Sequence, residues 1–221
     1  MIEFPNSALL WHNEVVKPYA QQRSPRILVL TPDELFPFKL DPFQIEAIEA
    51  LNQGSSVVVC APTGSGKTLV GEYAIHRALH ANKRVFYTTP LKALSNQKLR
   101  DFRHLFGPNK VGLLTGDASI NRDAPILVMT TEIFRNMLYG TTMGEVGEAV
   151  KDLQTVVLDE CHYMNDRQRG TVWEESIIYC PPKIQLVGLS ATVANGDQLT
   201  DWITKIHGPS QLVYSDFRPV P

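Results

Sequence analysis

The residue types best suited to hold phosphate form one short run in the first third of the sequence. The run follows an apolar stretch, precedes a segment with helical spacing, and ends in a lysine and a threonine. Gly64 and Gly66 let successive backbone N–H groups curl around phosphate oxygens, and the start of a helix adds positive potential. We expect Lys67 to reach the terminal phosphates of a nucleotide and the Thr68 hydroxyl to bind Mg²⁺. The residues expected to contact the nucleotide are Ala61, Pro62, Thr63, Gly64, Ser65, Gly66, Lys67 and Thr68.

The first position of this run departs from the usual phosphate-loop pattern, which begins with glycine. This chain has Ala61 there. The structural alternative is a Gly/Ser-rich turn before a helix that binds nothing.

Two adjacent carboxylates, Asp159 and Glu160, follow a second apolar run at residues 156–158. In an open parallel sheet, ligands bind at the carboxyl ends of the strands. We expect Asp159 to hold the metal opposite the phosphate loop, and Glu160 to activate water as the general base. The alternative is a solvated acid pair at a strand end. The expected catalytic set is Glu160, Lys67 and Asp159, and the expected metal site is Thr68, Asp159 and Glu160.

Strands and helices alternate from residue 41 onward, which positions these groups. Asp41 and Pro42 are typical of a helix start, and Gly54 of a helix end. Strands that are apolar on both faces and alternate with helices predict an α/β fold, in which helices cover both faces of a parallel sheet. The expected strands are 56–60, 84–89, 110–114, 126–129, 155–158 and 184–189, and the expected helices are 42–53, 67–81, 91–106, 131–139, 171–178 and 197–206.

The two ends of the sequence look different from this regular part. Six of the 15 prolines fall within the first 42 residues. We therefore expect residues 1–35 to be a largely irregular extension, with a possible short strand at 27–30. Residues 36–211 are expected to form the domain, with a flexible connection at 140–147, and residues 212–221 to begin a linker.

Bulk composition excludes several classes of protein. The net charge of −2 gives no general attraction for polyanions, so nucleic-acid contacts must be local. No apolar run approaches the roughly 18 residues of a membrane span, and the N-terminus lacks a signal-peptide pattern. Three widely spaced cysteines favour neither a disulfide framework nor a zinc site. We expect a cytoplasmic, reducing location and no membrane contact.

Further along the chain, the motifs resemble those of one family. Residues 159–162, Asp-Glu-Cys-His, resemble the DExH box of superfamily-two helicases, and the continuation through 163–175 is similar to the SKI-type branch of exosome-associated RNA helicases and their bacterial and plastid relatives. The other similar segments, in the family's order, are 38–44 (an adenine-recognising Q-type motif), 88–94 (motif Ia), 115–117 (motif Ib), 130–132 (motif Ic) and 190–192 (motif III). The resemblance covers about residues 36–221, and in these helicases motif I commonly begins with alanine.

The resemblance implies the first RecA-like lobe of a P-loop NTPase that uses ATP and Mg²⁺. Gln44 would contact adenine with Phe38 stacking nearby, although Gln44 lies three residues after Asp41 and is also placed to close a capping box. His162, Ser190 and Thr192 would couple hydrolysis to RNA movement. Residues expected to contact RNA are Thr89, Pro90, Lys92, Gly116, Asp117, Thr130 and Thr131.

Other prominent side chains receive plainer interpretations. Asn96, Lys98 and Arg100 are expected on a solvated helix face, and Cys161 is expected to be a passive filler of the box. Glu174 and Glu175 are expected on a helix surface.

Helicases of this class take their arginine fingers from a second RecA-like lobe. No such motif follows Thr192, and residues 218–221 resemble the family's entry into that lobe. We therefore expect the chain to be the first lobe of a longer RNA helicase, with little ATP turnover alone, whose partners are RNA, the second lobe and an RNA-decay or processing complex. The alternatives are a DNA helicase, a non-hydrolysing nucleotide-gated module and a P-loop kinase.

Overall fold

A computed structural model of the chain describes residues 31–139, 150–165, 170–192 and 195–216. The possible strand at 27–30, most of the proline-rich extension, the connection at 140–147 and residues 217–221 of the expected linker lie outside the described residues. No helix within the described ranges is long and apolar enough to cross a membrane.

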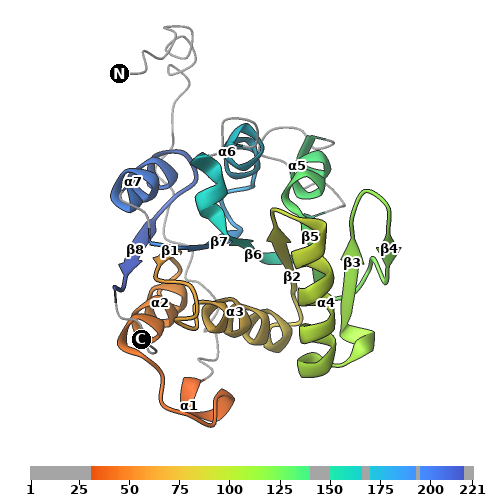
Figure 1. The fold of residues 1–221 in the computed structure, drawn as a ribbon, viewed down its shortest axis with the longest axis horizontal. Helices are drawn as coiled ribbons and strands as arrows, with labels where there is room; N and C mark the ends of the chain where they lie inside the picture. The colour runs from red at the N-terminus through yellow and green to blue at the C-terminus, as the bar shows by residue number, and fades with distance from the viewer. Residues whose placement is uncertain (1–30, 140–149, 166–169, 193–194, 217–221) are drawn as a thin grey trace, which may run out of the picture.

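An eight-stranded sheet forms the middle layer of the molecule (Figure 1). Its strand order is β4-β3-β5-β2-β6-β7-β1-β8, and every neighbouring pair is parallel except β3 and β4. The expected α/β fold with a parallel sheet is confirmed. The strands are β1 (Ser56–Cys60), β2 (Arg84–Thr89), β3 (Val111–Leu114), β4 (Ser119–Ile120), β5 (Ile126–Thr130), β6 (Leu153–Asp159), β7 (Gln185–Ser190) and β8 (Ser210–Tyr214).

Helices cover both faces of this sheet (Figure 1). One face carries α2 (Pro42–Asn52), α3 (Thr68–His80) and α4 (Lys92–Phe106), and the other carries α5 (Thr131–Tyr139), α6 (Gly170–Ile178) and α7 (Gly196–Ile206). The remaining elements are the short α1 (Pro32–Leu35) and two 3₁₀ helices, η2 (Pro108–Lys110) and η4 (Cys161–Asn165).

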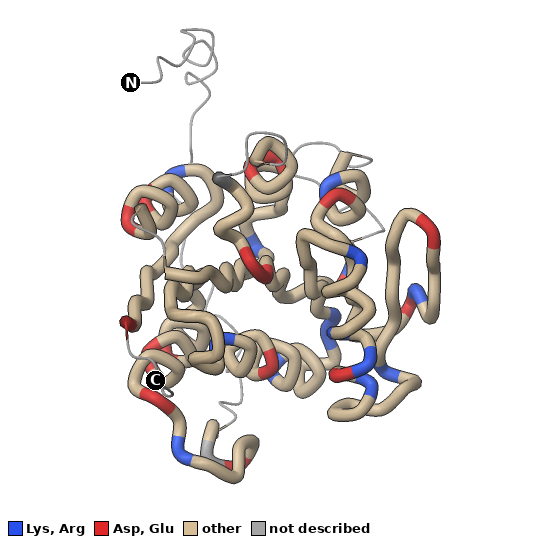
Figure 2. Tube along the Cα trace, viewed as in Figure 1, with Lys and Arg blue, Asp and Glu red and all other residues tan. Residues whose placement is uncertain are grey.

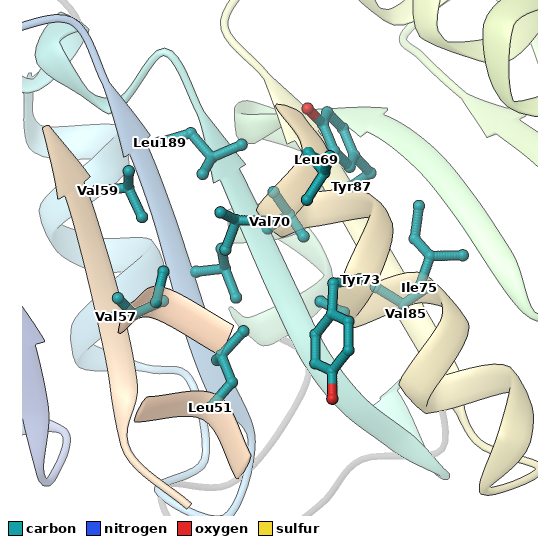
Figure 3. Close-up of a cluster of buried hydrophobic side chains, with 14 of the residues drawn as sticks. Leu51, Val57, Val59, Leu69, Val70, Tyr73, Ile75, Val85, Tyr87 and Leu189 are labelled. Atoms are coloured by element: carbon teal, nitrogen blue, oxygen red, sulfur yellow. The ribbon is translucent and has the colours of Figure 1, made fainter. Parts of the chain in front are cut away.

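The core has two parts, one on each side of the sheet. In β1, Val57 and Val59 belong to the hydrophobic cluster beneath α2 and α3, whereas Val58 and Cys60 belong to the cluster beneath α6 and α7. Successive side chains of a strand point to opposite faces, so a strand covered on both faces must be apolar at every position. Figure 3 shows the first cluster, in which Tyr87 and Tyr73 present their hydroxyl groups at opposite ends.

The expected domain boundary after residue 211 is wrong. Residues 212–214 belong to β8, which pairs with β1 in a register that places Val213 opposite Val59, and Val213 is fully buried. The segment is too short to show a period by itself, and its strand conformation depends on the free edge of β1. The two-residue strand β4, which turns back along β3, was also not predicted.

The strand ends place the polar motifs along one edge of the sheet. The final residues of β2, β5, β6 and β7 are Thr89, Thr130, Asp159 and Ser190. Because these strands run parallel, their carboxyl ends meet at the same edge, where the loop after β1 also emerges.

Candidate nucleotide and nucleic-acid site

The loop between β1 and α3 has the backbone of a phosphate cradle. Gly64 and Gly66 adopt φ angles of +82° and +85°, in the region that favours glycine. The Lys67 Nζ group folds back and donates to the carbonyl oxygens of Ala61 (2.9 Å) and Pro62 (3.0 Å). The Ser65 hydroxyl is buried without a hydrogen-bond partner among the described residues. An unpaired buried hydroxyl beside a lysine fits a loop built to take phosphate oxygens.

The charge on Lys67 is partly enclosed. The residue is 9% exposed. Burial lowers the pKa of the Lys67 ammonium, and the carboxylates of Glu160 and Asp159 oppose that shift. The loop and the two acids therefore share one electrostatic site, as expected from their places at the ends of β1 and β6.

Gln44 fastens α2 to this loop. Its Oε1 accepts from the Asp41 N–H (2.9 Å), which closes a capping box, and its Nε2 donates to the Gly66 carbonyl (3.1 Å). The capping-box alternative is thus present in the structure, together with a contact to the loop that was not predicted. Each polar atom of the amide retains one further bonding position, so adenine contact stays a prediction. Phe38, the expected stacking residue, is 56% exposed and packs against Phe36.

We expect Gly66→Ala to destabilise the nucleotide-free chain by about 2–3 kcal/mol. The positive φ costs about 1–2 kcal/mol for a residue with a Cβ. A Cβ there would also lie 2.8 Å from Gln44 Nε2, so the amide would lose its bond to the loop, at about 1 kcal/mol. Thermal or urea unfolding measures the change.

Gly64→Ala is the matched control, because its φ is as positive and nothing lies within 4 Å of a Cβ placed there. It should cost about 1–2 kcal/mol, the conformational part alone. The excess cost of Gly66→Ala should disappear in a Gln44→Ala background. An excess that persists there would contradict the role assigned to Gln44.

Asp159 is held in one orientation by two donors. Its Oδ2 accepts from the buried Tyr87 hydroxyl (2.7 Å), and its Oδ1 accepts from the Glu160 N–H (3.0 Å). Burial, followed by the Asp159 charge, raises the pKa of Tyr87 well above its ordinary value, so Tyr87 is a neutral donor. Glu160 adopts a φ of +57°, a left-handed conformation that is uncommon outside glycine and clusters at functional sites.

Lys98 is not on a solvated face, which corrects the expectation for this residue. Its Nζ donates to the Thr68 hydroxyl (3.2 Å) and lies 3.7 Å from Asp159 Oδ2, and its side chain is 16% exposed. A hydroxyl and a carboxylate are hard oxygen donors of the kind that magnesium binds, and a cation already lies between them. The residues expected to bind Mg²⁺ at this point therefore fit such an ion.

His162 connects the acidic pair to motif III. Its Nδ1 accepts from the Ala191 N–H (3.4 Å) and lies 3.3 Å from Glu160 Oε2. A ring nitrogen that accepts from Ala191 has no proton to give to Glu160, so the two contacts exclude each other as hydrogen bonds. The contact runs through the Ala191 backbone, whereas Ser190 is fully buried and Thr192 is exposed.

Cys161 is buried too, and burial raises the pKa of its thiol to about 12, as suits an unreactive filler.

Burial changes the interpretation of the expected RNA contacts. The Thr89 hydroxyl donates to the Leu91 carbonyl (3.1 Å) and lies 2.7 Å from Ser95 Oγ, so it fixes the start of α4. The Thr131 hydroxyl donates to the Thr89 carbonyl (3.3 Å). These two side chains are enclosed and already hydrogen-bonded within the chain, and direct RNA contact through them stays a prediction. The other expected RNA residues that are buried are Pro90 and Thr130.

Motifs Ia and Ib meet at the surface. Lys92 Nζ lies 3.0 Å from Asp117 Oδ1, Asp117 also accepts from the Thr115 hydroxyl, and Gly116 beside them is exposed. The Lys92 and Asp117 side chains are 55% and 68% exposed. A phosphate that pairs with Lys92 would therefore lie beside the Asp117 carboxylate or take its place. Lysine and arginine occur on elements on both sides of the sheet, with acidic residues among them (Figure 2).

Two residues of the site were missed at the level of sequence, Tyr87 and Lys98. Tyr87 lies in an apolar strand, where its ring is indistinguishable from a core residue, and Lys98 lies on a helix with a strongly polar sequence. Glu175, in contrast, lies on a helix surface as expected, where it pairs with Arg135 at 3.4 Å.

Comparison with known proteins agrees with the motifs. The DEAD/DEAH box helicase family matches residues 41–199. The chain is 57% identical over 188 residues to the chloroplastic DExH-box ATP-dependent RNA helicase DExH15 of Arabidopsis thaliana, covering 85% of this chain and 16% of that protein. It is 49% identical over 205 residues to the ATP-dependent RNA helicase mtr4 of Schizosaccharomyces pombe (92% and 17%), and 51% identical over 185 residues to the probable helicase HelY of Mycobacterium tuberculosis (84% and 20%).

Solved structures show the same fold. The Mycobacterium smegmatis helicase Lhr, bound to single-stranded DNA and AMP-PNP, matches with a TM-score of 0.63 and 27% identity, covering 83% of this chain and 26% of that one. The helicase MrfA bound to DNA and AMPPNP matches with a TM-score of 0.67 and 21% identity, covering 85% and 28%. The chain spans only 16–20% of the length of the curated relatives DExH15, HelY and mtr4. With the loop, the acidic pair and the later motifs in one RecA-like domain, the chain belongs to the DEAD/DEAH box helicase family.

Proposed function

We propose that this chain is the ATP-binding lobe of an ATP-dependent RNA helicase, in which ATP hydrolysis drives unwinding or translocation of RNA. One observation carries the proposal. The phosphate loop and the DExH acids lie at one sheet edge, and they are close enough for Lys98 to contact both Thr68 and Asp159. A solvated acid pair or a ligand-free turn would not need that arrangement.

The chain's own groups supply part of the machinery for the reaction. Water attacks the γ-phosphorus while Glu160 accepts the proton of that water, and the bond to the β-phosphate oxygen breaks to leave ADP and phosphate. Lys67 releases the Ala61 and Pro62 carbonyls to pair with the terminal phosphates. Tyr87 keeps Asp159 oriented. When bound, Mg²⁺ supplies positive charge at the β- and γ-phosphates, and Thr68 and Asp159 would hold it.

The coupling to nucleic acid is proposed to run along the same sheet edge. Motif Ia begins α4 and motif Ic begins α5, and Thr89 and Thr131 bond these starts to one another. Helix N-termini and backbone N–H groups bind phosphate without reading bases, which suits a translocase indifferent to sequence. The missing arginines come, in this proposal, from a second RecA-like lobe, and the protein works inside the cell with RNA-processing partners.

DNA is the second candidate substrate. The solved structures of Lhr and MrfA contain bound DNA, whereas DExH15 and mtr4 are named RNA helicases. The higher identity to the RNA helicases favours RNA.

The test is steady-state ATP turnover by the full-length protein with single-stranded RNA, with single-stranded DNA of the same sequence, and without nucleic acid. We expect stimulation by RNA to exceed stimulation by DNA, and this 221-residue chain alone to bind ADP with little turnover. Equal or greater stimulation by DNA would select the second candidate. Nucleotide binding without turnover under any condition would indicate a non-hydrolysing module.

A further inference from the structure

The ammonium group of Lys98 lies where two expected magnesium ligands converge. It donates to Thr68 Oγ1 at 3.2 Å and lies 3.7 Å from Asp159 Oδ2. These two oxygens come from the first turn of α3 and the end of β6, which are 91 positions apart in the sequence (159 − 68). Lys98 itself comes from the third element, α4, so three elements contribute to one point.

The ammonium group of Lys98 also lies over two aromatic rings. Its Nζ lies 5.4 Å from the ring centre of Tyr87 and 5.9 Å from that of Phe102, within the range of cation–π attraction. Both rings are fully buried, and they contact each other edge to face at 4.9 Å. The side chain is therefore held over a rigid aromatic surface instead of ranging through solvent.

The surroundings of Lys98 are acidic. Besides Asp159, Glu72 of α3 is near enough for its electrostatics to be affected: burial raises the pKa of Glu72, and the Lys98 charge opposes that rise. Tyr87, a neutral donor, occupies the same Asp159 oxygen that Lys98 approaches. The Asp159 carboxylate thus has a cation beside it even when no metal is bound.

We propose that Lys98 is a tethered cation that neutralises the metal position of the nucleotide site and is displaced when Mg²⁺ enters with the nucleotide. It is a positioning residue, because it acts through Thr68 and Asp159. This inference rests on the proposed function, since it assumes a magnesium nucleotide. With Lys98 in place, the site keeps part of its affinity for nucleotide phosphates without metal, and Mg²⁺ has to compete with an ammonium group for Asp159.

The experiment measures the dissociation constant of N-methylanthraniloyl-ADP by fluorescence anisotropy, in excess EDTA and in excess MgCl₂. Lys98→Met keeps the stem over the two rings and removes the charge. We expect the variant to bind more weakly than wild type in EDTA and about as well in MgCl₂. The ratio of the dissociation constant in EDTA to that in MgCl₂ should rise by about 2- to 5-fold, as expected for a partly exposed ion pair.

Arg100→Met is the matched control, because it removes one positive charge from the exposed side of the same helix. Its ratio should equal that of wild type. Equal weakening of Lys98→Met in both buffers would overturn the proposal, because it would show a phosphate contact that persists beside the metal. An unchanged ratio with unchanged affinities would also overturn it. Failure of wild type to bind nucleotide in either buffer would instead refute the proposed function.

Discussion

Glu160→Gln should leave the full-length protein able to bind ATP and nearly unable to hydrolyse it, with kcat lower by about 10²- to 10⁴-fold. The amide has almost the shape of the carboxylate but cannot accept the proton of the attacking water. The Glu160 backbone N–H, which donates to Asp159 at 3.0 Å, is unaffected by the substitution. Asp159, the proposed metal ligand, therefore keeps this contact, and only the proposed base is changed.

The measurement is steady-state ATP turnover with saturating RNA, alongside the dissociation constant of a fluorescent ATP analogue. We expect the dissociation constant to change by less than about 3-fold, which corresponds to less than about 0.7 kcal/mol of binding free energy. Glu174→Gln is the control. It makes the same change on the exposed side of α6, near His162 but away from the phosphate loop, and should retain wild-type turnover. Similar turnover by wild type and Glu160→Gln would remove Glu160 from the role of base.

The parts of the fold predicted from sequence are those with strong local signals. β1 and β2 were predicted with their observed bounds, because short apolar runs flanked by turn residues leave few alternatives. The phosphate loop follows from Gly64, Gly66 and Lys67 together, whose chemistry is specified by residue type. In contrast, β8 is a strand because it pairs with the edge of β1, and the local sequence of β8 has no pattern that indicates this pairing.

The sequence indicated which residues gather at the candidate site, but it did not indicate the contacts that support them. Asp159 could be assigned because a carboxylate ends an apolar strand. Its contacts with Tyr87 and Lys98 could not be assigned, because these residues reach it from other elements over 72 and 61 positions of sequence (159 − 87 and 159 − 98). The Thr89 hydroxyl was expected to contact RNA because the sequence alone does not distinguish a strand-end threonine that faces a ligand from one that fixes the start of a helix. In the structure, its contact with Ser95, one turn into α4, shows that it fixes the helix start.

Lys67→Met should abolish nucleotide binding without unfolding the loop. In the nucleotide-free structure the ammonium bonds to the Ala61 and Pro62 carbonyls. With nucleotide bound, the same group is expected to pair with the β- and γ-phosphates. A charged hydrogen bond is worth about 1.5–3 kcal/mol, so loss of two such contacts predicts a dissociation constant higher by about 100-fold or more.

Stability should behave differently from affinity in this variant. Burial lowers the pKa of the Lys67 ammonium, which shows that the charged form is disfavoured by its surroundings even though Glu160 and Asp159 attract it. Methionine removes that unfavourable desolvation together with the two bonds to carbonyls, and the effects oppose each other. We expect the melting temperature of the nucleotide-free chain to move by less than about 4 °C in either direction, roughly 1 kcal/mol for a domain of this size.

Thermal unfolding and anisotropy titration with N-methylanthraniloyl-ADP test the two halves of this expectation on the same samples. Lys205→Met, the same substitution at an exposed position in the last turn of α7, should change neither quantity. Wild-type affinity in Lys67→Met would contradict the phosphate contact. A much larger fall in melting temperature would mean that the bonds to Ala61 and Pro62 hold the loop in shape, and the lost affinity would then report a collapsed cradle and not a missing charge. If the two glycines give the loop its shape and Lys67 gives it its charge, the loss of Lys67 should lower the affinity for nucleotide and leave the melting temperature nearly unchanged.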